Sequence, residues 1–143
     1  FPLPQIPGFN APGAPAAQPA ASADQQALID ATNRYRVAHG VRPLAPMPQL
    51  NAVAQDWANT MAREDAPRHR PDIQTAYPAG WRMARENVLM VNPPRDADGL
   101  VAGWSASAGH NANMLDPSLT HIGVGIATAP NGDQYAVQNF ATY

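Results

Sequence analysis

The sequence predicts an α+β fold in which helices cover a small antiparallel sheet, and two observations support this. Apolar residues recur at helical spacing between residues 24 and 104. The end of the chain instead holds two strand-like runs, Ile122–Thr128 and Gln134–Thr142, joined by Pro130-Asn131-Gly132-Asp133. An Asn-Gly pair in such a connection is a strong signal for a β-hairpin. Helices on an antiparallel sheet are the hallmark of the α+β class.

Residues 1–22 are predicted to form an extended arm. They include six prolines with many alanines between them, and proline fixes φ and removes a backbone donor, which favours a polyproline-like chain over a helix. The first part of the arm is apolar, and its residues would either pack on their own domain or dock onto a partner: Phe1, Leu3, Ile6 and Phe9. A start at Phe1 suits a secreted or extracytoplasmic protein whose signal peptide was removed, although a trimmed chain would begin in the same way.

Two helices are predicted next. The first is capped by Ser22 or Asp24 and ends at Gly40, which can take a left-handed turn. Its apolar face consists of Leu28, Ala31, Tyr35 and Ala38. The second runs from Pro48 to Ala66 with proline tolerated in its first turn, and its stripe consists of Leu50, Val53, Ala54, Trp57 and Met61.

The middle of the chain is predicted to be mostly irregular until a third helix. Residues 67–80 hold three prolines, and a short extended segment follows around Glu86–Val91. Asp96 or Asp98 can cap a helix that Gly109 closes, with Leu100, Val101 and Trp104 inward. His110–Leu115 is predicted as a further helical turn that stops at Asp116-Pro117.

The composition excludes several classes of protein. The chain has 143 residues, 45% of them hydrophobic, which is enough for one domain with its own core. It has no cysteine, so disulfide scaffolds, thiolate metal sites and cysteine nucleophiles are excluded. No run of Lys or Arg is present, so we expect no nucleic-acid partner. We also expect no transmembrane segment, because no uninterrupted apolar stretch is long enough to span a bilayer.

Several segments, in order, resemble the CAP superfamily, which includes cysteine-rich secretory proteins, insect venom antigens and plant pathogenesis-related proteins. NRYRVAHGVRPL and LNAVAQDWANTMA are similar to the first two helices of that family, and Arg85-Glu86-Asn87-Val88 is similar to its Gly-Glu-Asn-Ile segment. GWSASAGHNANML resembles its Trp helix with the following Gly-His, and IGVGIA and YAVQNFA resemble its final hairpin. The resemblance covers roughly Asp24 to Tyr143, and ordered agreement over many segments is more specific than one short motif.

The resemblance implies a three-layer α-β-α sandwich over residues 23–143, with His69, Glu86 and His110 gathered in a cleft. One carboxylate of the family's animal and plant members is missing, because the position of their second cleft glutamate falls at Ser107. Shorter bacterial members often have such a reduced site. Relatives are associated with sterols, fatty acids, other apolar ligands and protein partners.

The implied cleft permits two kinds of chemistry. His69 and His110, with Glu86 as a ligand or as a partner of bound water, would be a ligand set known from catalytic zinc sites. The alternative is a polar cleft held by hydrogen bonds, with a divalent metal such as Zn²⁺ bound only when supplied. A Ser107–His110–Glu86 arrangement would be needed for a serine hydrolase, but the sequence shows no nucleophile elbow, and we prefer Ser107 as a small replacement for the lost glutamate.

Three functions follow as hypotheses. In the first hypothesis, the chain is a secreted, non-enzymatic binding module for an apolar, lipid-like or sterol-like ligand. In the second, it is an accessory subunit that the arm attaches to an envelope or membrane protein complex. In the third, it is a metal-dependent hydrolase of envelope or peptide material. We favour the binding module, with arm docking as its most concrete form.

Overall fold

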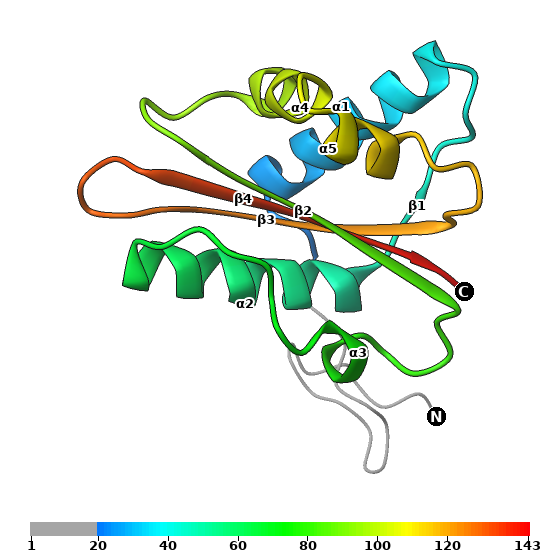
Figure 1. The fold of residues 1–143 in the computed structure, drawn as a ribbon, viewed down its shortest axis with the longest axis horizontal. Coiled ribbons are helices and arrows are strands. Elements are labelled where there is room, and N and C mark those ends of the chain that lie inside the picture. Colours follow the sequence, from blue (N-terminus) through cyan, green and yellow to red (C-terminus); the bar gives the residue numbers. More distant parts are fainter. Residues whose placement is uncertain (1–19) are drawn as a thin grey trace, which may run out of the picture.

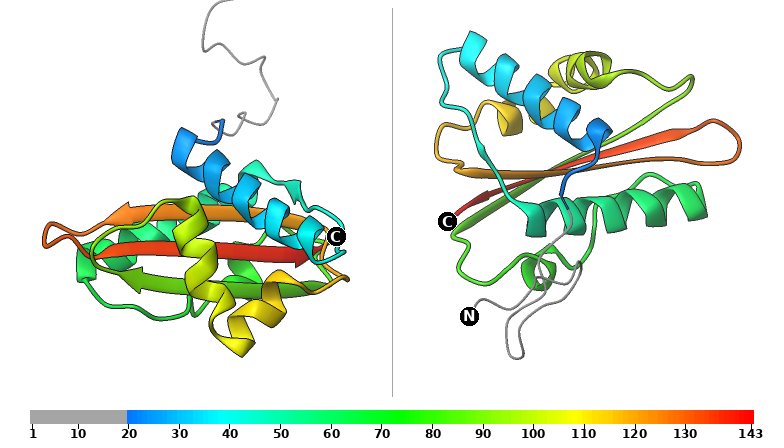
Figure 2. Two further views of the ribbon diagram at one scale, coloured as in Figure 1. Left: turned by 90° about the horizontal axis from the view of Figure 1, so that it is seen from above. Right: turned by 180° about the vertical axis from the view of Figure 1, so that it is seen from behind.

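The structure is a computed structural model that describes residues 20–143, and its elements form three layers (Figure 1). In chain order they are α1 (Ala23–Ala38), β1 (Ala45–Pro46), α2 (Pro48–Glu64), α3 (Ile73–Ala76), β2 (Met83–Val91), α4 (Ala97–Ser105), α5 (Ala108–Met114), β3 (His121–Thr128) and β4 (Gln134–Thr142). Helices α1, α4 and α5 cover one face of the sheet, and α2 and α3 lie on the other (Figures 1 and 2). This arrangement confirms the predicted α-β-α sandwich. The predicted arm lies outside the described residues except for 20–22.

The four strands form one sheet in the order β1-β3-β4-β2. Strands β3 and β4 pair antiparallel over their whole length, as do β4 and β2. The two-residue β1 runs parallel to β3, beside the predicted antiparallel sheet that β2, β4 and β3 form. Strand β2 is therefore an edge strand, and it carries Glu86.

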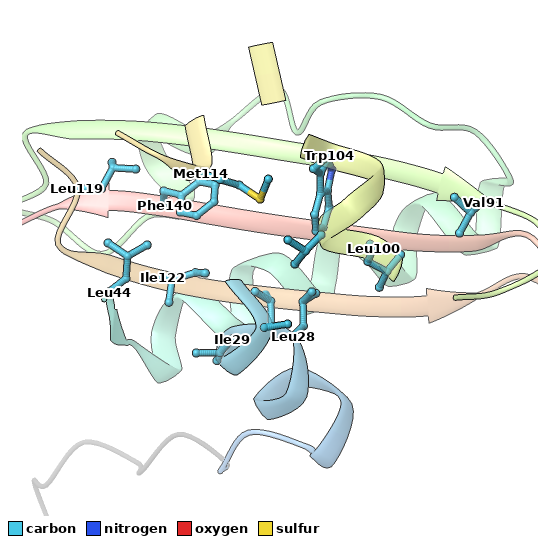
Figure 3. Packing of buried hydrophobic residues seen from close by; sticks show 14 residues of the cluster. Leu28, Ile29, Leu44, Val91, Leu100, Trp104, Met114, Leu119, Ile122 and Phe140 are labelled. Atoms are coloured by element: carbon cyan, nitrogen blue, oxygen red, sulfur yellow. The ribbon is translucent and has the colours of Figure 1, made fainter. Parts of the chain in front are cut away.

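Strand β4 lies at the centre of both cores, because helices cover it on both faces. Its even-numbered residues Ala136 and Phe140 pack with α1, α4 and α5 (Figure 3). Its odd-numbered residues Tyr135 and Val137 pack with α2. The alternation of side chains along a strand explains why nearly the whole of β4 is buried.

Helix α2 packs directly on the backbone of β3. Gly123 and Gly125 face it, and a Cβ atom at either position would lie closer than 3.0 Å to the backbone of α2, at Leu50 or Ala54. Glycine is needed here for close approach rather than for a special φ angle.

The predicted helix starts are largely confirmed. Ser22 caps α1, and Gln25 completes a capping box with it. Pro48 begins α2, and Asp96 rather than Asp98 caps α4 through the amide of Gly99. Gly40 takes the left-handed conformation just after α1.

Four local predictions were wrong. Ala38 is exposed rather than on the buried face of α1. Residues 67–80, predicted as irregular, contain the one-turn helix α3. Helix α4 ends at Ser105, and Gly109 lies inside α5 instead of closing the preceding helix. Helix α2 ends at Glu64, because Asp65 adopts a left-handed conformation.

Candidate functional site

The candidate site is built on the edge strand β2, where consecutive residues serve opposite faces of the sheet. Glu86 is paired with Asn139 of β4, and Asn87 is paired with Gln138. Glu86 points to the face that α2 covers, because it shares that face with Asn139 and Val137. Asn87 points to the face that α1, α4 and α5 cover.

The carboxylate of Glu86 is buried, and each of its two oxygens is in contact with at least one donor. Its Oε1 atom is 2.9 Å from His69 Nδ1 and accepts a 2.9 Å hydrogen bond from the amide of Arg70. Its Oε2 atom accepts a 2.9 Å bond from Asn139 Nδ2. Only 3% of the Glu86 side chain is exposed. A buried carboxylate needs such compensation, so these three contacts fix the loop before α3 and the edge of the sheet together.

His69 is held at one nitrogen and open at the other. Because a carboxylate oxygen accepts, Nδ1 carries the proton in the contact with Glu86. The neutral ring then has an unprotonated Nε2, and 67% of the side chain is exposed. The pair therefore presents an oriented imidazole to solvent, with its tautomer set by Glu86.

The segment that carries His110 reaches β2 from the opposite layer. Asn87 donates to the backbone oxygen of His110 at 3.0 Å, and Asn113 Nδ2 donates to Asn87 Oδ1 at 2.9 Å. Asn87 also donates to Gln138, which donates to Thr32 of α1. The structure thus joins His69 to Glu86 directly and fixes α5, with His110, against the next residue of the same strand.

Ser107 precedes α5 as its N-cap residue and is exposed. Within residues 20–143 its hydroxyl has no hydrogen bond to His110 or Glu86. Activation of a serine requires a base within hydrogen-bond reach. The geometry of the described residues therefore lacks the contact that a Ser107–His110–Glu86 hydrolase needs.

A catalytic zinc site usually has three protein ligands, and the described part of the chain does not supply a set of that kind. No group of three or more His, Asp or Glu side chains within residues 20–143 is arranged to hold a metal ion. Glu86 also has its two oxygens engaged by protein donors. The side chains as placed do not fit a three-ligand metal centre.

Two cavities in the described surface lie away from Glu86. One, of about 600 Å³, lies on α1 around Arg34 and Val37. The other, of about 330 Å³, lies between α1, Leu100 of α4 and Gln134 of β4. Neither is lined by His69, Glu86 or His110.

Sequence reasoning missed Asn139 and the Asn87–Gln138–Thr32 chain of hydrogen bonds. A signal was present, because Gln138 and Asn139 are adjacent polar residues within a strongly apolar strand. Alternation sends one to each face of the sheet. The arm residues Phe1, Leu3, Ile6 and Phe9 lie outside the described residues. No helix in the described range has the length and apolar character required to cross a membrane.

A sequence profile of the CAP family, described as the cysteine-rich secretory protein family, matches residues 29–140. The protein YkwD of Bacillus subtilis is 27% identical over 111 residues, which are 73% of this chain and 42% of YkwD. An extracellular protein of Bacillus anthracis that contains an SCP domain superposes with a TM-score of 0.70 and 26% identity, over 84% of this chain and 40% of the other. The chain spans about two fifths of the length of each of these relatives.

A more distant structure bears on the question of metal. The structure of NaASP2 with Zn²⁺ superposes with a TM-score of 0.61 and 14% identity, over 90% of this chain and 83% of that one. At this identity the likeness concerns the fold alone. Its zinc is a property of that protein.

Proposed function

The chain belongs to the CAP family of cysteine-rich secretory proteins, and we propose that it is a secreted, non-enzymatic binding module or accessory subunit of a cell-envelope assembly. One observation carries the proposal. The carboxylate of Glu86 is bonded to His69, Arg70 and Asn139, and this supports a rigid polar site in which the acid positions other groups. A base or nucleophile would have to reach its substrate, and only 3% of the Glu86 side chain is exposed.

Attachment through the arm is the most concrete form of this function. Phe1, Leu3, Ile6 and Phe9 would be the anchors, since extended proline-rich segments lose little conformational entropy when they dock. Extracellular placement is supported by the relative from Bacillus anthracis, which is an extracellular protein. The domain would then be presented at the envelope with its His69–Glu86 face available.

The arm is tested by its retention on isolated cell envelopes. Serine at all four anchor positions should release the protein into the unbound fraction while the domain stays folded. A matched control places serine at Ala14, Ala16, Ala17 and Ala20, which keeps the number of substitutions and the prolines. Equal retention of the two variants would rule out the arm as the attachment site.

Binding of an apolar ligand in the cleft is the other form of the module. The probes are a fluorescent sterol and a fluorescent fatty acid, added to the full chain. Saturable binding with no chemical change in the probe supports the proposal. Conversion of either probe to a product contradicts a non-enzymatic module.

A metal-dependent hydrolase is the second candidate, and the exposed Nε2 of His69 favours it. In this candidate His69 and His110 would contribute two ligands and Glu86 would orient His69, so the remaining ligands of the divalent ion would have to be water or substrate. The test is hydrolysis of peptide and envelope substrates at saturating Zn²⁺. Activity that survives both His110→Ala and His69→Ala removes this candidate, and activity lost only in Ser107→Ala assigns the reaction to the serine instead.

A further inference from the structure

A set of partly buried apolar side chains gathers where α2 begins, α3 lies and the chain ends. Met47, Ile73, Trp81 and Tyr143 form this set, which we call the aromatic surface. They come from four separate segments and rest on the buried residues Leu50, Tyr77 and Ala141. All of these groups lie on the face of the sheet that α2 and α3 cover.

The rings of the aromatic surface are fixed by their neighbours. Trp81 meets Tyr77 edge-on, with ring centroids 6.3 Å apart. Tyr143 meets His121 edge-on at 5.3 Å and donates its hydroxyl to the backbone oxygen of Pro78 at 2.8 Å. A ligand would therefore meet rigid rings and would lose little entropy in ordering them.

Trp81 also offers an unused donor. Within residues 20–143 its indole N–H makes no hydrogen bond, whereas the indole of Trp57 donates to the backbone oxygen of Arg68 at 2.9 Å. Fixed aromatic rings with an available N–H are the features that bind polyproline segments, whose prolines stack on rings and whose carbonyls need donors.

We propose that the aromatic surface binds the chain's own proline-rich segment, residues 1–19. That segment carries no charged residue, and it contains Pro4-Gln5-Ile6-Pro7, in which two prolines have the spacing of a polyproline ligand. Its apolar residues match the apolar side chains of the surface. No charged partner is needed for the contact.

The path of the chain permits this contact within one molecule. Gln25, near the start of α1, donates to the backbone of Val124 on β3 and to Gln55 on α2. Met47 lies at the N-terminus of the same helix, about 12 Å from Gln55 at 1.5 Å per residue. A polyproline segment of 19 residues spans about 60 Å, so it reaches the aromatic surface with length to spare.

This inference does not rest on the proposed function, because it requires only this chain. It adds a condition to arm docking. An external partner that uses Phe1, Leu3, Ile6 or Phe9 must first displace the segment from Trp81 and its neighbours.

The test exploits the absence of cysteine, which allows one spin label at one introduced site. The full chain carries Ala11→Cys with a nitroxide, and paramagnetic broadening is measured by NMR. We expect strong broadening at the indole N–H of Trp81 and the amide of Tyr143, and little at Arg34 on the far side of the sheet. Trp81→Phe keeps a ring but removes the N–H, so the ratio of docked to free segment should fall about fivefold, the effect of one lost hydrogen bond.

Val37→Ala is the matched control, since Val37 is a large exposed apolar residue on another face. This variant should leave the ratio of docked to free segment unchanged. Equal broadening on both sides of the sheet overturns the proposal. Unchanged broadening in Trp81→Phe overturns the assignment to this surface. A mixture of spin-labelled chains with isotope-labelled, cysteine-free chains should show no paramagnetic broadening. Broadening confined to that mixture would mean that the segment binds a second copy instead.

Discussion

Glu86 and His69 share one hydrogen bond but differ in exposure, and that difference assigns their roles. The acid is buried and meets three donors, whereas most of the imidazole faces solvent. Removing one partner of a buried charged group costs more than the pair contributes, because the remaining group is left without compensation. Glu86 is thus the residue whose loss the site tolerates least, and His69 is the one that can meet a ligand.

Glu86→Gln should destabilise the domain by about 2 kcal/mol, because the amide group turns one acceptor into a donor that faces Asn139 or His69. The measurement is the midpoint of urea denaturation, together with the ring ¹⁵N shifts of His69, which should show loss of the fixed tautomer. The chain has one other glutamate, Glu64, which pairs with Arg68 on the surface of α2. Glu64→Gln should cost no more than about 0.5 kcal/mol. Equal losses in the two variants would contradict the role of Glu86.

The sequence could identify Glu86 but not its environment. Its position followed from the resemblance of the Arg85–Val88 segment to a family motif. Its contact with Asn139 depends on the register of β2 against β4, which places Glu86 opposite Asn139. A shift of one residue would bring Gln138 to that place and move every side chain to the other face. Register is set by packing over the whole sheet, so residue types alone could not supply it.

At the scale of elements, the close contact between α2 and β3 depends on the missing side chains of two glycines. Gly125→Ala should destabilise the protein by about 3 kcal/mol or more, because the added methyl group meets the backbone of Ala54, which cannot move aside by a change of rotamer. Thermal and urea denaturation measure the loss. Failure to fold would reflect the same clash, and every other side chain also brings a Cβ atom to this position, so a companion variant is placed at another glycine.

Gly109→Ala provides that companion variant. Gly109 lies inside α5, and nothing is within 4 Å of an added Cβ there. Alanine favours a helix over glycine, so this variant should gain about 0.5 kcal/mol. Destabilisation by Gly109→Ala would mean that the residue ends a helix, as the sequence predicted.

Long elements were predictable and short ones were not. Helix α1 has its N-cap and α2 its N-terminal proline in the sequence, both have an apolar face, and the hairpin has its turn residues. In contrast, α3 is a single turn and β1 pairs two residues with β3. Isolated segments of that length are not stable, so tertiary contacts decide them. The boundary between α4 and α5 was misplaced because glycine was read as a helix end.

At the scale of the whole molecule, Arg36 connects three segments from inside the protein. Its side chain is fully buried, and it donates to the backbone oxygens of Arg42, Met114 and Asp116 at 2.8, 2.8 and 3.0 Å. Burial lowers the pKa of Arg36, although the charge of nearby Asp116 opposes that effect. The side chain holds α1, the connector before β1 and the end of α5 together.

Arg36→Met should therefore cost about 3 kcal/mol or more, since it leaves three backbone oxygens without donors. Arg36→Lys should lose less, because an ammonium group can still bond some of the three oxygens. Urea denaturation ranks the variants if both fold. Arg34→Met, two residues earlier, removes an exposed pair with Asp98 and should cost under about 1 kcal/mol. The same small loss at both positions would show that Arg36 is dispensable.

At the opposite end of the molecule, hydrogen bonds to two carboxylates join the hairpin to neighbouring segments and make the stability of the fold depend on pH. Asn92 donates to Asp133 at 3.0 Å, while Asn131 donates to both Asp133 and Asp65. Asp65, at the end of α2, also accepts from Tyr135, whose pKa is raised to about 12 by burial and by that carboxylate. The bond from Asn92, together with that from Asn131, holds the pKa of Asp133 below its usual value.

A lowered pKa in the folded state means that the unfolded chain binds the proton more readily. Asp133 therefore contributes stability above its unfolded pKa of about 4, and this contribution is lost as the pH falls toward the folded value. Asn92→Ala removes the main cause, so it should lower the urea midpoint at pH 7 and lower it less as the solution becomes more acidic. Asn59→Ala, which removes an exposed amide acceptor on α2, should show a pH-independent difference. A constant deficit of Asn92→Ala from pH 7 to acid would mean that the ionised Asp133 does not hold the hairpin to the rest of the molecule.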